Sequence, residues 1–353
     1  MTQQMIYKDI SIVSLILGYN IMRVSEHYLR VHAFKYNYTK EQTTFISETI
    51  GEYKVTLLIY SGLPDPVWTI GSQNEKFQQI KELLDNARAK GNIFGYKNIP
   101  PLLGFRGFLV QQSGAHGEEL ILGKETEDLQ KLLLDTMPEE SIKENLRLKI
   151  LQAIDLGAVS PKVPDATQDS LASVSSQIPS KEDKGDVGVI EHYAPKYNPD
   201  RWNKIPVILR YNNCYNYANQ KITNSFAQPG YASGYYPYKM TPEDLIKACE
   251  SDGLVKMDVD PSAPCPEAPP QPNCLIALLV AEGVDYHCYR LDDTDPPGYW
   301  SQKLGGTPVT NLDGKKDKIT DPRKAVNPSA TDYKFVTFMK IFTNIIDGPL
   351  SPP

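Results

Sequence analysis

The feature that most constrains the fold is a polar segment near the middle of the chain. Residues 160–186 consist largely of Ser, Pro, Asp, Lys and Gln and contain no aromatic residue. Such a composition cannot bury enough apolar surface to offset the entropy lost on ordering. We therefore predict a disordered linker over residues 159–188, with a globular part on either side.

The chain of 353 residues is also longer than one hydrophobic core usually serves, so we predict two domains. We expect an α+β domain of unknown role at residues 51–158 and a second α+β domain at residues 189–353. Residues 1–50 form a lead-in that we leave unassigned. Its apolar run Ile10–Leu17 is similar to a short signal-peptide core, but no small-x-small cleavage site follows it. Localisation stays open, with an extracellular location favoured over a cytoplasmic one.

In the first domain, the residue pattern predicts a small sheet covered on one face by helices. Lys54–Tyr60 and Val67–Ile70 are strand-like runs joined by a Gly- and Pro-containing turn. Asn74–Ala89 carries apolar residues at helical spacing. Further along the chain we expect a hairpin over residues 104–122 and two helices, Glu127–Asp135 and Pro138–Leu156.

Trp68, Arg106 and Asp65 are the residues of this domain that could form a binding surface. A core Trp and a solvated Arg are commoner arrangements, and we expect those instead.

The charge pattern speaks against nucleic acid as a partner. The formal net charge is −6, and Lys and Arg are scattered rather than clustered with aromatic residues. No phosphate-binding Gly-rich loop, His-Glu-x-x-His or Cys-x-x-Cys motif occurs, so we expect no cofactor and no metal site. No run approaches the roughly twenty apolar residues that a membrane-spanning helix needs, so we expect no transmembrane segment. The sequence does not indicate an oligomeric state.

Tyrosine is unusually frequent, with 21 residues, many of them in the stretches Tyr211–Tyr217 and Tyr231–Tyr238. Tyrosine combines a large contact area with a polar tip, and it is also a common strand residue. The pattern predicts a tyrosine-rich sheet surface or, alternatively, the wall of a groove for a peptide or glycan-peptide.

All five cysteines lie in the second half of the chain. If the chain is secreted and one cysteine is a free nucleophile, four remain for two disulfides. Cys265 and Cys274 flank a Pro-rich loop and are the pair we favour for a disulfide, although the pattern does not require one.

Cys214 is the candidate nucleophile. The polar run Asn212–Asn219 reads as a loop that enters a helix, which places Cys214 at or near the helix N-terminus. Unpaired N–H groups there lower the pKa of a thiol, and the thiolate is the nucleophilic form.

A base must then come from elsewhere in the chain. His192 and His287 are the histidines beyond the linker, and His287 lies on the strand-like run Val284–Arg290. Strand alternation predicts that Cys288 points away from the His287 surface. Gln302, on the following strand-like run, could orient the imidazole, and the competing residues for this role are Asp292, Asp293 and Asn311.

The order of a Cys at a helix start, a His on a strand and a polar residue on the next strand resembles the papain-like fold, particularly its NlpC-type and CHAP-type cysteine peptidases and amidases. The stretches 212–218, 285–290, 298–303 and 320–323 are also similar to an uncharacterised family of bacterial and invertebrate proteins. The resemblance covers roughly residues 190–340. It implies Cys214 as nucleophile, His287 as base and Gln302 as the orienting residue.

Two functions are compatible with these features. The first is a thiol-dependent hydrolase or acyltransferase that acts on an amide bond of a peptide or glycan-peptide. Its oxyanion would rest on the Cys214 backbone N–H and a donor such as Asn212 or Asn213. The second is a non-catalytic secreted binding or matrix protein that uses a tyrosine-rich surface on the same fold.

Overall fold

The computed structural model describes residues 51–115, 117–162, 194–235, 239–260, 262–269, 274–293, 299–326 and 331–351. By its backbone contacts the chain divides into two compact units, residues 1–52 with 112–114 and residues 53–111 with 115–353. Apart from Gln112, the elements below belong to the second unit. The expected lead-in and nearly all of the expected linker lie outside the described residues, so those two assignments stay predictions.

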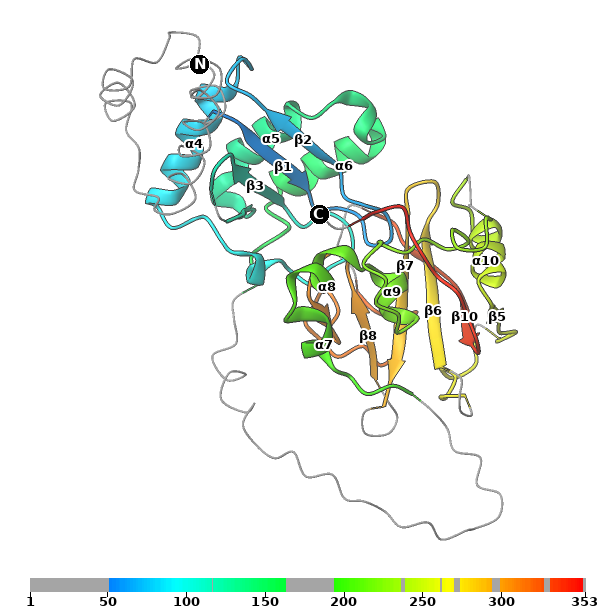
Figure 1. Ribbon diagram of the computed structural model, residues 1–353. Helices are drawn as coiled ribbons and strands as arrows, with labels where there is room; N and C mark the ends of the chain where they lie inside the picture. The colour runs from blue at the N-terminus through cyan, green and yellow to red at the C-terminus, as the bar shows by residue number, and fades with distance from the viewer. Residues whose placement is uncertain are drawn as a thin grey trace, which may run out of the picture. The chain divides into compact units, whose positions relative to one another are not determined.

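The first sheet is four-stranded, in the order β2-β1-β3-β4. Its strands are β1 (Tyr53–Leu57), β2 (Val67–Ile70), β3 (Phe108–Gln112) and β4 (Glu119–Ile121). β1 pairs with β2 and β3 pairs with β4, both antiparallel, and the β3–β4 pair is the hairpin expected from the sequence. Its helices are α4 (Phe77–Ala89), α5 (Glu127–Asp135) and α6 (Glu144–Asp155), all drawn beside the sheet in Figure 1.

Apolar residues on one side of each helix join the sheet in a single core. Ile80 and Leu84 of α4, one turn apart, are fully buried together with Val55 of β1. Leu133 of α5 and Ile150 of α6 belong to the same cluster. The amphipathic spacing in the sequence therefore correctly marks the faces that pack.

One helix begins later than expected. The sequence pattern predicts a helix from Pro138, but α6 starts at Glu144, after a short 3-10 turn over Glu139–Ser141. Ile142 is extended, with φ −145° and ψ 157°, and its side chain is buried in the core. The chain leaves helical geometry there and buries an apolar side chain that the helical pattern would place elsewhere. Two other 3-10 turns cover Tyr96–Asn98 and Lys124–Thr126.

The second sheet is six-stranded and antiparallel, in the order β5-β10-β6-β7-β8-β9. Its strands are β5 (Leu254–Lys256), β6 (Cys274–Ala281), β7 (Asp285–Asp292), β8 (Tyr299–Lys303), β9 (Val309–Thr310) and β10 (Lys334–Ile341). Every residue of β6 and β7 is buried, so both faces of the sheet centre are covered. With helices and two antiparallel sheets, the fold belongs to the α+β class, as predicted.

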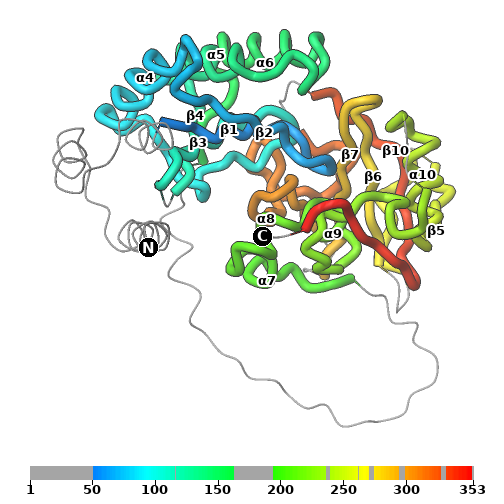
Figure 2. Tube along the Cα trace, turned by 45° about the horizontal axis from the view of Figure 1, so that its top comes forward, coloured from blue at the N-terminus to red at the C-terminus, as the bar shows by residue number. Residues whose placement is uncertain are grey.

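Short helices accompany this sheet. They are α7 (Pro199–Asn203), α8 (Pro206–Tyr211), α9 (Cys214–Ala218) and α10 (Pro242–Ser251). α9 packs against β7, and both views draw the two side by side (Figures 1 and 2). Tyr286 and Cys288 of β7 share a core with α9, whereas Tyr289 and Leu291 belong to a different one with Trp300.

Candidate functional site

Cys214 is the first residue of α9, where the sequence places it. Asn213 immediately before it caps the helix, because its Oδ1 accepts the N–H groups of Tyr215 at 3.0 Å and Asn216 at 3.1 Å. Asn216 returns the bond, since its Oδ1 accepts the Asn213 N–H at 3.1 Å. This reciprocal capping explains why the Asn-rich run starts a helix at this residue.

The Cys214 side chain is fully buried, in the core cluster that α9 shares with β7. Burial alone raises the pKa of the thiol, but side-chain hydrogen bonds with Cys288 and His287, the charge of the imidazole and a hydrogen bond with Ser61 hold it well below the ordinary value. The pKa of the Cys288 thiol shifts in the opposite direction. Its own burial and the neighbouring Cys214 raise this pKa well above the usual range. Of the two thiols, only that of Cys214 has the imidazole and the Ser61 hydroxyl among the groups that lower its pKa.

His287 lies on β7 and is also fully buried. Its Nδ1 lies 2.5 Å from Oγ of Ser61. The ring packs edge-on against Tyr289, with centroids 4.5 Å apart, and against Tyr333 at 6.5 Å. Among the described residues, Nε2 has no hydrogen-bond partner.

Gln302 faces the same side of the sheet as His287 but is not directly opposite it. Its register partner on β7 is Tyr289, two residues further along. Its Nε2 donates to the Leu312 carbonyl at 2.8 Å, and its Oε1, like Nε2 of His287, lacks a partner in the described part of the chain. A diagonal neighbour is within reach of a long side chain. The orienting role of Gln302 stays a prediction.

The expected separation of Cys288 from the His287 surface is only partly correct. Cys288 does lie in the core shared with α9, on the side that alternation assigns to it. Cys214 nevertheless interacts with both Cys288 and His287. β8 pairs with β7 only from Tyr289 to Asp292, so no β8 residue is paired with His287.

The proposed oxyanion donors are occupied by structural hydrogen bonds. The amide nitrogen of Asn212 donates to the Ile208 carbonyl at 2.9 Å and to Asn224 at 2.8 Å. That of Asn213 donates to the carbonyls of Gly62 and Ala227, both at 2.8 Å.

Of the competitors of Gln302, which are Asp292, Asp293 and Asn311, only Asp292 has a side-chain partner among the residues that the structure describes. Asp292 pairs with Arg290 at 2.6 Å, and both side chains are buried. The Asn311 carbonyl accepts the Ile319 N–H at 3.0 Å.

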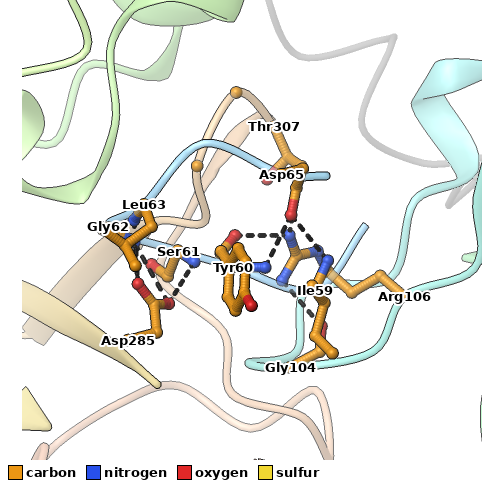
Figure 3. A network of polar contacts seen from close by, with 12 residues as sticks. Ile59, Tyr60, Ser61, Gly62, Leu63, Asp65, Gly104, Arg106, Asp285 and Thr307 are labelled. Atoms are coloured by element: carbon orange, nitrogen blue, oxygen red, sulfur yellow. Dashed lines mark hydrogen bonds and ion pairs between the residues drawn. The ribbon is translucent and has the colours of Figure 1, made fainter. Parts of the chain in front are cut away.

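A turn from the first half of the chain completes the site, and Figure 3 shows its polar contacts. The Asp285 carboxylate accepts the backbone N–H groups of Ser61 at 2.6 Å, Gly62 at 3.2 Å and Leu63 at 2.9 Å. The Tyr333 hydroxyl donates to the same carboxylate. Burial raises the pKa of Asp285 to about 7, against the opposing effect of these hydrogen bonds. Ser61 and Asp285 thus tie β7 to the loop that follows β1.

A second carboxylate holds the other side of the turn. Asp65 accepts the N–H groups of Ile59 at 2.8 Å and Tyr60 at 2.7 Å (Figure 3). Arg106 donates to the carbonyls of Gly104 at 2.9 Å and Tyr60 at 2.8 Å and lies 3.7 Å from Asp65. Its side chain is fully buried, so the expectation of a solvated arginine is wrong. The guanidinium braces the loop that presents Ser61.

Other expectations have mixed outcomes. All five cysteines are free, so the Cys265–Cys274 disulfide that we favoured is not formed. In the described ranges, no cluster of His, Cys, Asp and Glu could hold a metal ion. No helix there has the length and apolar character needed to cross a bilayer. His192 and Tyr236–Tyr238 lie outside the described residues.

Sequence reasoning missed Ser61 and Asp285. Ser61 was recognised only as part of a turn, and Asp285 only as a member of the strand-like run Val284–Arg290. An acidic residue inside an otherwise buried strand is a usable signal, because buried carboxylates need donors. Nothing local, however, indicates that those donors are the N–H groups of a turn more than 200 residues earlier.

Comparison with known proteins gives one informative relative. Over 138 residues the chain is 44% identical to "Insoluble matrix shell protein 1" of Ruditapes philippinarum. The aligned segment covers 39% of this chain and 85% of the clam protein. No protein-family model matches the chain, and no solved structure matches it.

Proposed function

The chain belongs to the family of the clam Insoluble matrix shell protein 1, and from this we propose that it is a non-catalytic component of an insoluble matrix. The single observation that carries the proposal is that match, which spans most of the clam protein. In this proposal the second half of the chain is a rigid scaffold, and contacts with the matrix are made by its surface.

The burial of the candidate site supports a scaffold. Cys214, His287 and Gln302 are each 0% exposed. The amides of Asn212 and Asn213 are used to hold neighbouring loops. The buried hydrogen bonds of these two amides favour one packing arrangement. Tyr231 and Tyr235, which are among the exposed large side chains, offer aromatic contact area with a polar tip.

Sequential extraction of the tissue that produces the chain tests this proposal. The tissue is extracted with salt buffer, then with non-denaturing detergent, and finally with denaturant, and each fraction is probed with an antibody against residues 189–353. We expect the protein in the last fraction. Recovery of most of it in salt buffer would overturn the matrix assignment.

A second candidate function is favoured by one specific observation, the position of the buried Cys214 at the start of α9, where its thiol interacts with the buried His287. In this alternative, Cys214 attacks an amide carbonyl and His287 protonates the leaving amine. Water or a second amine then resolves the acyl-enzyme, which returns the thiol. This is the chemistry implied by the papain-like resemblance, and it requires the buried thiol to become accessible.

The matched variant Cys214→Ser tests the alternative. The full-length chain and the variant are incubated with a mixed library of peptide amides, with and without an added amine, and the products are read by mass spectrometry. Hydrolysis or amine exchange that only the wild type performs would support the thiol hydrolase or acyltransferase. Identical product profiles for the two chains would exclude it for peptide amides.

A further inference from the structure

The Ser61–Leu63 turn contacts the candidate site through the Ser61 hydroxyl and through its main chain. Three successive N–H groups of the turn bond to one carboxylate, that of Asp285. On the other side, the Gly62 carbonyl accepts the amide nitrogens of Asn213 and Gln228, each at 2.8 Å. A peptide backbone binds through its N–H groups, which need acceptors, and its carbonyls, which need donors. Here the carboxylate of Asp285 accepts from the N–H groups, and the amides of Asn213 and Gln228 donate to the carbonyl.

The site also selects the residue at the centre of the turn. A Cβ built on Gly62 would lie 2.4–2.6 Å from ring atoms of Tyr286, a separation that real contacts do not show. The Tyr286 ring cannot readily yield, because it is fully buried and its hydroxyl bonds to the Ala227 carbonyl at 3.3 Å. Glycine is therefore required for the backbone to approach this closely.

The turn lies next to the thiol, because the Gly62 carbonyl accepts the amide nitrogen of Asn213, the residue before Cys214. Oγ of Ser61 lies 2.5 Å from Nδ1 of His287, and Ser61 and Gly62 are buried. Leu63 is half-buried and Pro64 is exposed, so the chain returns to the surface within two residues. The part of the turn at the site is therefore short, and hydrogen bonds to Asp285, Asn213 and Gln228 hold it in place.

We propose that Cys214 and His287 lie in a binding site for a glycine-containing peptide backbone, and that the chain's own Ser61–Leu63 turn fills this site and withholds the thiol. The inference goes beyond the matrix function and does not depend on it. Its test reads thiol accessibility, whereas the matrix proposal is tested by extraction, so the two can fail independently.

The first experiment displaces the turn with Gly62→Ala and uses Gly71→Ala as the matched control. Gly71 has open space where a Cβ would be built and no positive φ. Iodoacetamide labelling of the folded chains at neutral pH is followed by peptide mass spectrometry, with buried Cys249 as the internal reference. We expect labelling of Cys214 relative to Cys249 to rise by about tenfold or more in Gly62→Ala and to change by less than about twofold in Gly71→Ala.

A second variant and a competing peptide complete the test. Asp285→Asn replaces one of the two oxygens that accept the three N–H groups with an amide nitrogen, and we expect it also to raise Cys214 labelling selectively. A synthetic peptide of residues 58–66, supplied at millimolar concentration, should suppress labelling of Gly62→Ala, whereas the same peptide with Val at position 62 should not.

Three results would overturn the proposal. Unchanged Cys214 labelling in both variants would show that the turn does not guard the thiol. A parallel rise at Cys214 and Cys249 would show that the turn is an ordinary part of the core. Equal effects of the two peptides would show that no backbone-binding site is present.

Discussion

Oγ of Ser61 lies 2.5 Å from Nδ1 of His287, although the two residues are 226 positions apart in the chain. The contact joins a turn after β1 of the first sheet to the centre of β7 in the second. Both side chains are fully buried, so neither can exchange its partner for water without local opening. The site that sequence reasoning assigned to the second half of the chain therefore includes a residue of the first half.

The first prediction concerns this bond. Replacing Ser61 with Ala leaves Nδ1 of His287 buried without its hydroxyl partner, which should lower the free energy of unfolding by about 1–3 kcal/mol. Urea unfolding followed by circular dichroism measures the change. Ser262→Ala is the control, because the exposed Ser262 hydroxyl bonds only locally, to Asp260, and should cost less than about 0.5 kcal/mol. Equal costs for the two variants would contradict a structural role for the bond.

The second prediction is a pH dependence that originates in Asp285. Burial raises its pKa to about 7 from the ordinary 3.8, so the folded chain holds this proton more tightly than the unfolded chain. The resulting contribution to stability is complete below about pH 4 and is lost as the pH rises through about 7. At about 1.4 kcal/mol per pKa unit, the loss is on the order of 4 kcal/mol.

Urea unfolding at several pH values between 4 and 8 measures this slope in the wild type and in Asp285→Asn. Asn does not titrate, so the variant should show a shallower decline over the same window. Burial also raises the pKa of Asp65 and Asp292, which titrate in the same direction, so the difference between the two chains is the informative quantity. Parallel slopes would show that Asp285 does not hold the proton.

The third prediction concerns Lys303, which is fully buried and whose pKa is lowered well below the ordinary value by that burial. Its Nζ donates to the carbonyls of Leu209 at 2.6 Å, Gly305 at 2.8 Å and Thr307 at 3.0 Å. Lys303→Met removes all three donors while keeping the length of the side chain, and should destabilise the chain by about 1–3 kcal/mol or more. Lys256→Met, at an exposed position of β5, is the matched control in the same denaturation assay. A smaller loss at Lys303 than at Lys256 would refute the structural role.

The fourth prediction combines the expected linker with the observed contacts. Limited proteolysis should cleave within residues 160–186, because exposed polar segments are where proteases act. The two fragments should then stay together, since Lys143 bonds to the Gly283 carbonyl at 2.7 Å and Arg210 pairs with Glu118 at 2.8 Å, in addition to the Ser61 turn. Size-exclusion chromatography of the nicked protein checks this, and separate elution of the fragments would contradict it.

Local sequence patterns predicted the elements better than their associations. Val67–Ile70 and Glu127–Asp135 have the predicted bounds, and Cys214 begins a helix as its Asn-rich context indicated. These features depend on alternation, helical spacing and capping, which act over a few residues. Ile142 departs from the pattern because its extended backbone buries the side chain in the core, which outweighs helical continuity.

The candidate site was predicted only in part, for the same physical reason. Chain order and strand alternation pointed to Cys214 and His287, whose side chains interact in the structure. Ser61, the partner of Nδ1 of His287, could not be found in this way. The residues around a serine in a turn do not indicate which distant side chain its hydroxyl contacts. The Arg106 side chain was misjudged as solvated, since its acceptors are backbone carbonyls that no sequence motif displays.

The last prediction tests the coupling of Cys214 to His287 without requiring a substrate. The thiol is buried, so its absolute alkylation rate includes the cost of opening, but the pH at which the rate reaches half its maximum reports the thiolate. That pH should lie well below the ordinary thiol pKa, because the hydrogen bonds and charge around Cys214 lower its pKa despite burial. His287→Ala removes the charge, so the midpoint should move upward by about one pH unit or more, whereas Gln302→Ala should move it less. Iodoacetamide labelling over a pH series, read by peptide mass spectrometry, gives the midpoints.

Cys249 is the internal control, because burial raises its pKa and its profile should be the same in all three chains. A midpoint for Cys214 that is unchanged in His287→Ala would show that the two residues touch without sharing a proton equilibrium, and the thiol hydrolase or acyltransferase alternative would then lose its chemical basis.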